Sequence, residues 1–290
     1  MIYINPKALN IPIDWRESVK SLKAELLKKQ KNERTAYINS KRELTWGHPK
    51  ILEALRGPVG NKCWYTEVDL TGADPNIDHF RPKGNIKEID VDGLVATKIE
   101  CNGYWWLAFD YENFRLSSMH SNQRRVDVNT NGGKWDFFPV DGPRAKEGTA
   151  LTIINENVLP LDPCSATDVS LIWFEPDGKP GFKDWRPQPS QIEIRRLKVT
   201  TWLYHLDKIE LATKRANAME EIRTSLKRAD AFYQLWEREG FLPDRQERLH
   251  FDNALADIKA NIEDKSPFAG AKRCVIHVSK SEYLWMNDYF

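Results

Sequence analysis

Apolar residues recur at helical spacing near the start of the chain, with lysines on the opposite face. The apolar positions of this face are Trp15, Val19, Leu22 and Leu26. We expect a helix over residues 15–31. Asp14 can cap it, because an aspartate oxygen accepts hydrogen bonds from free N–H groups of the first turn. A second, short helix is expected to open at His48-Pro49, since proline is tolerated at the first helical position, and to end at Gly57-Pro58.

The same helical spacing returns from about residue 190. Its apolar positions are Leu203, Leu206, Ile209, Met219, Ile222, Leu226, Phe232 and Leu235. They predict one or two long helices up to Gly240, a third helix over 244–263, and a short one starting at Ser266-Pro267. Before these helices, residues 171–182 are expected to form a hairpin, because Asp177-Gly178 is a strong signal for a tight turn.

The middle of the chain has shorter apolar runs. Residues 76–80 and 113–118 are expected to form two short strands, and a helix is expected to begin over 121–126. Residues 62–67 have the composition of a strand or a turn. Residues 84–103 are rich in Gly, Asp and Asn, and we interpret them as an inserted loop.

Composition places the chain among ordinary globular proteins. It has 290 residues, 41% of them hydrophobic, and no apolar run approaches the ~20 residues of a membrane span. The first residues lack the charged-then-apolar profile of a secretory signal, and the four cysteines form no pair with metal-ligand spacing. We therefore expect a cytoplasmic protein with free thiols and no membrane partner.

The net charge of +1 hides an uneven distribution. Residues 1–66 contain 13 basic and 6 acidic residues, a net charge of +7, which leaves −6 for the rest of the chain. A basic segment suits contact with phosphate groups, although the charges alone favour a solvated helix face. The 11 tryptophans are expected mainly in the core, with one or two available to stack on bases.

Residues suited to phosphodiester chemistry are concentrated in one stretch of the chain. Asp78 precedes His79, a lone Asn113 precedes a short apolar run, and His120 or Asn122 opens the expected helix. Phosphodiester hydrolysis needs a base to activate water and a divalent cation to hold the scissile phosphate. Histidine, with a pKa near ~6.5, can be that base at neutral pH. Mg²⁺ prefers oxygen ligands such as Asp and Asn side chains.

These residues carry a resemblance to a known family. The segments DHFRPK (78–83), YWWLAFDYENFRLSS (104–118) and SNQRR (121–125) are similar to the HNH endonuclease subunit of Septu-type and retron-associated bacterial anti-phage defence systems. The resemblance spans roughly residues 60–215 and fades at both ends. It implies an α+β protein in which a ββα-metal (HNH) module is embedded in a mainly helical chain.

The resemblance and the periodicity together predict four regions. We expect a basic helical segment over residues 1–60 and the HNH module over 61–140. An irregular extension with a hairpin follows over 141–189, and a helical region over 190–290 completes the chain.

The resemblance also implies a role for each residue of the site. His79 is the implied general base. Asp78 is the implied ligand of Mg²⁺ or Mn²⁺, and Asn122 a second oxygen ligand, a role that His120 could take instead. Asn113 is implied to hold the loop and to orient His79 by hydrogen bonding. Structural alternatives are a satisfied core histidine for His79, an Asx turn for Asp78 and a helix cap for Asn122.

Basic residues flank these positions. They are Arg81, Lys83, Arg124 and Arg125. Guanidinium and ammonium groups there are expected to hold backbone phosphates of a nucleic acid. Taken singly, each is explained equally well as a surface charge.

The chain departs from the wider HNH pattern at one place. Many HNH proteins hold a structural zinc ion with two Cys-x-x-Cys pairs around the hairpin. The corresponding positions here are Cys63 and Thr66 in the first pair, and Ser118 and Ser121 in the second. Because hydroxyl groups are poor zinc ligands, we expect no structural zinc. The aromatic residues expected to hold the hairpin instead are Trp64, Tyr65, Trp105 and Trp106.

The leading hypothesis is a metal-dependent HNH endonuclease that hydrolyses nucleic acid, with DNA favoured, as an effector of prokaryotic anti-phage defence. The resemblance also implies an ATPase partner subunit, for which the helical region offers a docking surface. The alternative is a catalytically inactive HNH-like subunit that binds nucleic acid or acts as an adaptor in a defence complex.

The replacement of three expected cysteines by Thr66, Ser118 and Ser121 generates a first prediction. Elemental analysis of the purified protein is expected to find no stoichiometric zinc, because a single thiolate cannot complete a tetrahedral zinc site. One zinc ion per chain that survives mild chelation would contradict this prediction.

Overall fold

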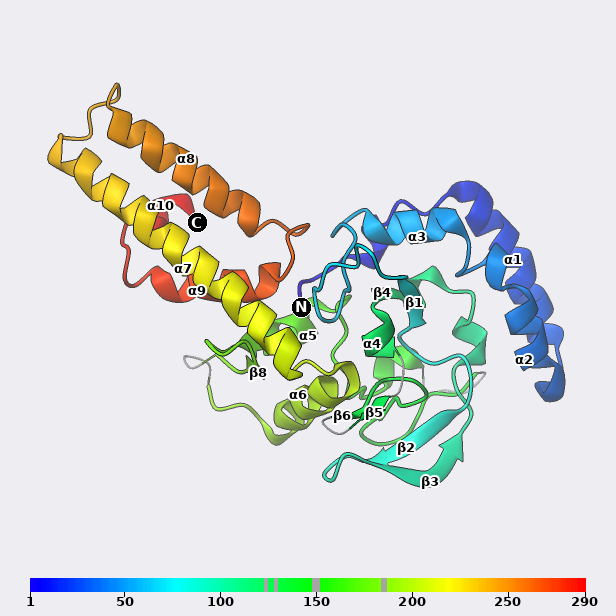
Figure 1. Ribbon diagram of the computed structural model, residues 1–290. Coiled ribbons are helices and arrows are strands. Elements are labelled where there is room, and N and C mark those ends of the chain that lie inside the picture. Colours follow the sequence, from blue (N-terminus) through cyan, green and yellow to red (C-terminus); the bar gives the residue numbers. More distant parts are fainter. Residues whose placement is uncertain (123–124, 128–129, 148–151, 184–186) are drawn as a thin grey trace.

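The computed structural model describes residues 1–290 apart from 123–124, 128–129, 148–151 and 184–186. The protein has an α+β fold in which helices dominate and the strands form small antiparallel sheets (Figure 1). The α-helices are α1 (Ile13–Lys28), α2 (Lys31–Ser40), α3 (Pro49–Arg56), α4 (Met119–Asn122), α5 (Ala166–Leu171), α6 (Gln191–Tyr204), α7 (Ile209–Arg238), α8 (Gln246–Asn261), α9 (Ala269–Ser279) and α10 (Met286–Tyr289).

Each described sheet is a pair of antiparallel strands. The pairs are β1 (Asn76–His79) with β4 (Phe114–Ser117), β2 (Ile86–Asp90) with β3 (Val95–Cys101), β5 (Arg125–Asp127) with β6 (Thr130–Gly132), and β7 (Trp173–Phe174) with β8 (Pro180–Gly181). Short 3-10 turns η3 (Trp105–Leu107) and η4 (Tyr111–Asn113) lead into β4. The pair β1–β4 lies in the centre of the molecule between the N-terminal helices and α4 (Figure 1).

The N-terminal helices follow the predicted pattern with one addition. Trp15, Val19 and Leu26 are buried on α1, and α3 begins at Pro49 with His48 as its cap. Asp14 lies inside the first turn of α1, and Pro12 is the capping residue. The additional helix is α2, which begins at Lys31 shortly after α1 ends and which the hydrophobic pattern did not predict. Gln30 and Glu33 form a capping box at its start, and only Ile38 is buried on it.

Residues 84–103, which we interpreted as an inserted loop, contain the hairpin β2–β3. The prediction of a loop was therefore wrong. Ile86 and Ile89 of β2 are buried, so the strand has an inner face despite its polar composition. The Lys87 N–H donates to the Asp136 carbonyl at 3.0 Å, which joins the hairpin to the segment after β6. A strand with only two buried positions has too weak an alternation to be recognised from sequence.

The predicted helix over 121–126 is also different in the structure. The helix α4 is a single turn, and β5 begins at Arg125. The hairpin predicted over 171–182 is present as β7–β8, which follows the short helix α5. None of the four cysteines forms a disulfide.

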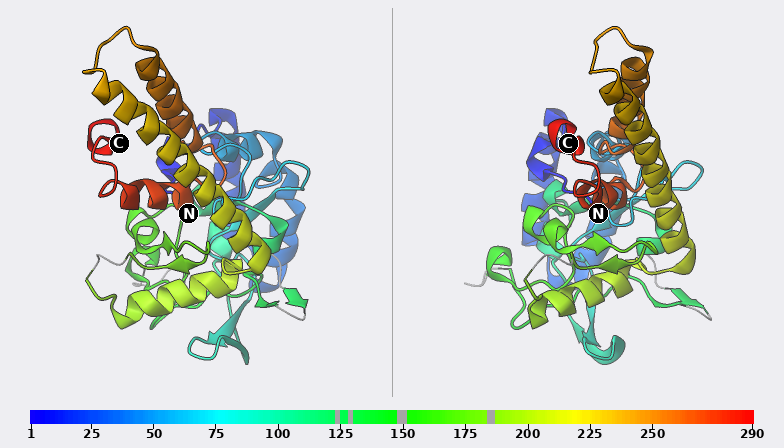
Figure 2. Two further views of the ribbon diagram at one scale, coloured as in Figure 1. Left: turned by 60° about the vertical axis from the view of Figure 1, so that its left-hand side comes forward. Right: turned by 90° about the vertical axis from the view of Figure 1, so that its left-hand side faces the viewer.

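The C-terminal helices form an extension of the main body. The helices α7 and α8 pack against each other, and the pair projects away from the strands (Figure 2). The helix α9 packs against α7 and β7. Within the residues that the structure describes, no helix combines the length and apolar character that crossing a membrane requires.

Candidate functional site

The strand β1 places two neighbouring side chains on opposite faces of a hairpin. In its pairing with β4, Asp78 lies opposite Arg115 and His79 lies opposite Phe114. Successive side chains of a strand alternate between faces, so the two residues enter different surroundings. Both side chains are buried, so each needs hydrogen-bond partners within the protein.

His79 lies among aromatic rings. Its imidazole makes edge contacts with Trp46 and Phe114, with ring centroids 5.0 and 5.1 Å away. Its Nε2 is 2.9 Å from the carbonyl oxygen of Ala108. Because a carbonyl only accepts, Nε2 carries the proton and Nδ1 keeps a lone pair. Burial, followed by the positive charge of Lys83, lowers the pKa of His79 well below its usual value, so the ring is a neutral base at pH 7.

Asp78 faces a buried cation that the sequence did not predict. The Lys134 ammonium donates to its Oδ2 and also to the backbone carbonyl of His79. The Tyr65 hydroxyl donates to the same carboxylate oxygen at 2.6 Å. The side chains of Lys134 and Asp78 are only 1% and 6% exposed, so the two charges neutralise each other away from water.

Lys134 belongs to the segment that follows β6, residues 133–137. This segment is joined to β2 by the Lys87 to Asp136 hydrogen bond and is closed by a turn in which the Phe137 N–H donates to the Lys134 carbonyl at 2.6 Å. Burial lowers the pKa of Lys134 to about 8, while the Asp78 charge opposes that change. In the sequence, Lys134 follows two glycines and resembles a surface residue. No periodic pattern links it to Asp78, which lies 56 residues earlier in the chain.

Asn113 ties the two halves of the hairpin loop together. Its Oδ1 accepts from the Arg81 N–H at 2.8 Å, and its Nδ2 donates to the Arg81 carbonyl at 2.9 Å. A longer contact of 3.5 Å joins Nδ2 to the carbonyl of Leu107, the residue before Ala108. Asn113 therefore holds the loop directly, whereas the hydrogen bond to the His79 ring comes from Ala108.

A pocket of about 390 Å³ opens beside these residues. Its lining includes Asp78, His79 and Lys83 from the β1 segment, Trp135 and Asp136 from the segment after β6, and Thr35, Ile38 and Asn39 from α2. Burial raises the pKa of Asp136, and the Lys83 ammonium lies 4.7 Å from the Trp46 ring centroid. The pocket thus combines a neutral imidazole, two carboxylates and an ammonium group.

The structure separates the predicted phosphate-binding residues. Lys83 lines this pocket, but Arg81 lines a different one, where its Nε donates to Glu156 at 3.1 Å. Arg124 lies outside the described residues, as do the side chains of His120, Asn122 and Arg125. The roles predicted for these four residues therefore stay predictions.

The four positions that the resemblance aligns with the zinc-binding cysteines of many HNH proteins lie close together. The Ser118 and Ser121 hydroxyls are 2.9 Å apart, and the Cys63 thiol lies 3.7 Å from Ser121. Thr66 lines the same small pocket as both serines. A hydrogen-bonded cluster of one thiol and hydroxyl groups thus joins the turn before β1 to the turn after β4.

The donor chemistry around Asp78 bears on whether a divalent cation fits here. A carboxylate at the edge of a polar pocket is a suitable hard ligand for Mg²⁺. The Lys134 ammonium already neutralises that carboxylate. A divalent cation therefore fits if it shares Asp78 with Lys134 or displaces it. Among the described residues, no three His, Cys, Asp or Glu side chains form a metal-binding group.

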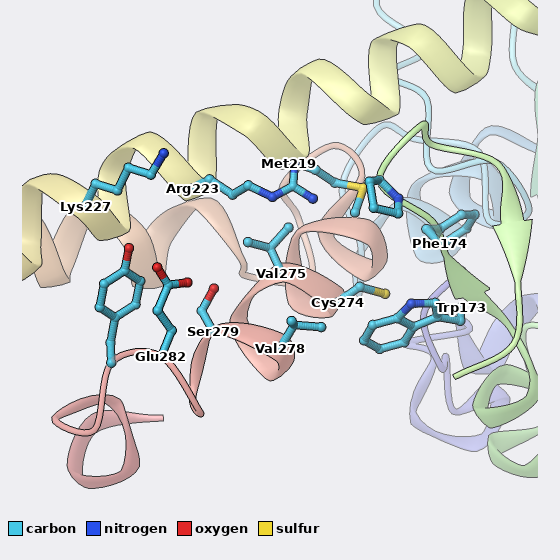
Figure 3. Close-up of a pocket in the computed structure, with 12 residues that line it drawn as sticks. Trp173, Phe174, Met219, Arg223, Lys227, Cys274, Val275, Val278, Ser279 and Glu282 are labelled. Carbon is cyan, nitrogen blue, oxygen red and sulfur yellow. The ribbon is translucent and has the colours of Figure 1, made fainter. Parts of the chain in front are cut away.

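A separate pocket lies away from this site, between α7, α9 and β7 (Figure 3). Its volume is about 170 Å³, and its walls are largely apolar, with Trp173, Phe174, Val275 and Val278. Arg223 and Lys227 project toward it from α7, and Glu282 lies on the opposite side. It contains none of the residues predicted for chemistry.

The buried ion pair generates a stability prediction. Lys134→Met is expected to lower the free energy of unfolding by about 3–5 kcal/mol, because Asp78 then remains buried without its cation. Urea denaturation at pH 7 measures this change. Adding Asp78→Asn to the Lys134→Met variant is expected to recover most of the loss.

The pair Lys179–Asp177 is a matched control, since it joins the same residue types at 3.1 Å with both side chains more than half exposed. Lys179→Met is expected to change the free energy by at most ~1 kcal/mol. Equal effects of Lys134→Met and Lys179→Met would contradict the importance assigned to the buried pair.

Comparison of the chain with models of protein families, with curated proteins and with solved structures found no match in any of the three. The resemblance to HNH nuclease subunits therefore rests on the sequence segments named above. Asp78, His79 and Asn113 form one hairpin-centred cluster, and a family assignment for the chain stays a proposal.

Proposed function

We propose that this protein is a metal-dependent HNH endonuclease that hydrolyses phosphodiester bonds, with DNA as the favoured substrate. The observation that carries the proposal is the hairpin β1–β4. It brings together a neutral buried histidine, an adjacent carboxylate and an asparagine-tied loop at one pocket. The turn α4 follows β4 directly, which is consistent with a ββα order.

His79 performs the proton transfer in this proposal. The hydrogen bond from its Nε2 to the Ala108 carbonyl fixes the tautomer, so Nδ1 accepts the proton of the attacking water. The hydrogen bonds of Asn113 to Arg81 hold the strand end that carries the ring. Lys83 supplies positive charge in the same pocket and suits a phosphate oxygen.

Asp78 would hold Mg²⁺ or Mn²⁺ together with Asn122 or His120. The bound cation would polarise the phosphate and stabilise negative charge on the leaving oxygen. Lys134 and Tyr65 orient the Asp78 carboxylate through their hydrogen bonds to Oδ2. These two residues extend the site beyond the residues of the motif.

The basic N-terminal segment supports a nucleic-acid substrate. Three residues of α2 line the pocket beside His79, so this segment borders the site. Its net charge of +7 over residues 1–66 suits a polyanion that crosses the pocket.

The alternative function, a non-catalytic nucleic-acid-binding or adaptor subunit, is favoured by one observation. Lys134 gives Asp78 a buried counter-ion, as expected for a carboxylate with a structural role. Packing alone accounts less well for an imidazole at the His79 position, because an apolar residue would fill this buried aromatic site at lower cost. We therefore retain the nuclease as the leading proposal.

A partner subunit belongs to the proposal as well, with an ATPase implied by the resemblance. The hairpin of α7 and α8 projects from the body (Figure 2), and large apolar side chains are exposed near its tip. These side chains are Leu235, Phe241, Leu242 and Leu249. Exposed apolar groups on a projecting element are typical of surfaces that bind another protein.

Replacement of the base tests the mechanism. His79→Ala is expected to lower the cleavage rate by roughly 10²- to 10⁴-fold, because no other group then takes the proton of water. Supercoiled plasmid in Mg²⁺ is the substrate, and circular dichroism verifies the fold. His250→Ala is the control, since His250 is exposed on α8, and its rate should equal that of wild type. Unchanged cleavage by folded His79→Ala would remove His79 from the mechanism.

The pH dependence of cleavage follows from the environment of His79. Since burial lowers the pKa of this ring, its basic form persists to a more acidic pH than in a free histidine. Cleavage at saturating metal is therefore expected to decline with a midpoint below pH ~6.5, the usual pKa of histidine. A midpoint above that value would contradict the assignment.

Replacement of the carboxylate separates an enzyme from a binder. Asp78→Ala is expected to abolish cleavage while nucleic-acid binding stays nearly unchanged, because the basic residues that contact phosphates remain. Gel cleavage and filter binding measure the two properties on the same preparation. The variant Asp78→Ala with Lys134→Met, which removes both buried charges and leaves no oxygen ligand on the side chain at position 78, is the safeguard against misfolding. Full cleavage by that folded double variant would exclude Asp78 as a metal ligand.

A further inference from the structure

A second pocket lies next to the candidate site, on the far side of a thin backbone wall. It has a volume of about 720 Å³. Its aromatic lining consists of Trp105 and Trp106 from η3. Its cationic lining consists of Arg34 from α2 and of Arg144 and Lys146, which lie further along the chain in residues 142–147. None of these residues has a role in the proton transfer or in metal binding.

The wall between the two pockets is formed by two glycines in contact. A Cβ atom on Gly103 would lie 1.7 Å from the carbonyl oxygen of Gly84, so the two segments touch without room for a side chain. Gly84 lines the pocket of His79, and Gly103 lines the second pocket. The Tyr104 N–H also donates to the Pro82 carbonyl at 2.8 Å across this contact. The helix α2 contributes residues to both pockets, so the two pockets are neighbours along this helix.

The aromatic walls of the second pocket are arranged as a corner. The rings of Trp105 and Trp106 are 6.0 Å apart and inclined at 83°. The Arg34 guanidinium lies 3.6 Å from the Trp105 ring centroid, and its Nε donates to the Lys29 carbonyl at 3.0 Å. Both indoles are only partly buried, which leaves part of their surface at the pocket.

The charged residues of this pocket are held in place. Arg144 donates to Glu88 at 2.7 Å and to the Tyr104 hydroxyl at 3.0 Å, so its guanidinium plane is oriented. The carboxylate of Glu88 is neutralised by this pair. The remaining charged residues of the lining are one carboxylate, Glu147, and two cations, Arg34 and Lys146. The net charge of the lining is therefore positive.

We infer that this second pocket binds one unpaired nucleotide of the nucleic-acid substrate, with its base stacked on the Trp105–Arg34 platform and its phosphate toward the pocket of His79. Unpaired bases are bound by stacking on aromatic rings and guanidinium planes, with basic groups following the backbone. A paired base hides both faces within the duplex, so only an unpaired or flipped-out base enters such a pocket. The inference rests on the proposed nuclease function and names a feature of its substrate.

Binding measurements in EDTA test this inference without any need for cleavage. The probe is a fluorescein-labelled oligothymidylate of about 12 nucleotides, a length within the range that single-strand-binding sites cover. One base at a time is removed by an abasic substitution, and fluorescence anisotropy gives each dissociation constant. Wild type is expected to lose roughly 5- to 150-fold in affinity at one position and little elsewhere, because one stacked base is lost.

The variant Trp105→Leu tests which residue the base contacts. Its affinity for the intact oligonucleotide is expected to equal the affinity of wild type for the oligonucleotide that lacks the stacked base. Removal of that base should then cause no further loss of affinity in the variant. Trp105→Phe keeps a smaller ring and should give an intermediate affinity. The control is Trp236→Leu, since Trp236 is also partly buried beneath an arginine, Arg248 at 5.6 Å, but lies on α7. Circular dichroism verifies the fold of all three variants.

Each outcome decides the inference independently of the nuclease. A flat abasic scan with wild type, no binding of the oligonucleotide, or full affinity in folded Trp105→Leu would overturn the nucleotide pocket. A flat scan together with metal-dependent cleavage would leave the nuclease standing without the nucleotide pocket. A position-specific loss in a protein that cleaves nothing even with its partner subunit present would support the pocket and remove the nuclease.

Discussion

A carboxylate and an ammonium group meet away from water at the centre of this molecule, in the pair of Asp78 and Lys134. Each charge alone would be strongly unfavourable in this position, and their attraction offsets that penalty only when both are present and hydrogen-bonded. The pair also joins β1 to the segment after β6, and Lys87 of β2 is hydrogen-bonded to that segment. The candidate base His79 directly follows Asp78 on β1, and Lys134 also donates to its backbone carbonyl. The position of His79 therefore depends on this ion pair.

The same hairpin imposes different environments on the two candidate side chains, Asp78 and His79. Asp78 is surrounded by donors, whereas His79 is surrounded by aromatic rings and makes one hydrogen bond to Ala108. The donors around Asp78 satisfy its carboxylate oxygen, whereas burial among the rings lowers the pKa of His79. Tyr65 extends this arrangement to the helical region, because its ring stacks on Tyr204 of α6 at 3.8 Å while its hydroxyl donates to Asp78.

The sequence predicted those parts of the fold that have a strong local signal. Helical spacing located α1, α3 and the long C-terminal helices to within a few residues, and the Asp-Gly turn located β7–β8. It missed α2, which has one buried residue, and β2–β3, which has little alternation. The site was predicted at Asp78, His79 and Asn113 from adjacent letters of a motif. Lys134 and Tyr65 could not be predicted, because they meet Asp78 through tertiary contacts without local pattern.

The central claim is that this hairpin cleaves nucleic acid with the help of a divalent cation. Incubation of the purified wild-type protein with plasmid DNA and with total RNA, in Mg²⁺, in Mn²⁺ and in EDTA, tests it most directly. The account predicts cleavage of at least one nucleic acid, with DNA favoured, in the presence of the cation and none in EDTA. If the partner subunit is required, the same dependence on the cation is expected in the assembled complex. Intact DNA and RNA under all of these conditions, with the partner included, would contradict the account and favour the adaptor.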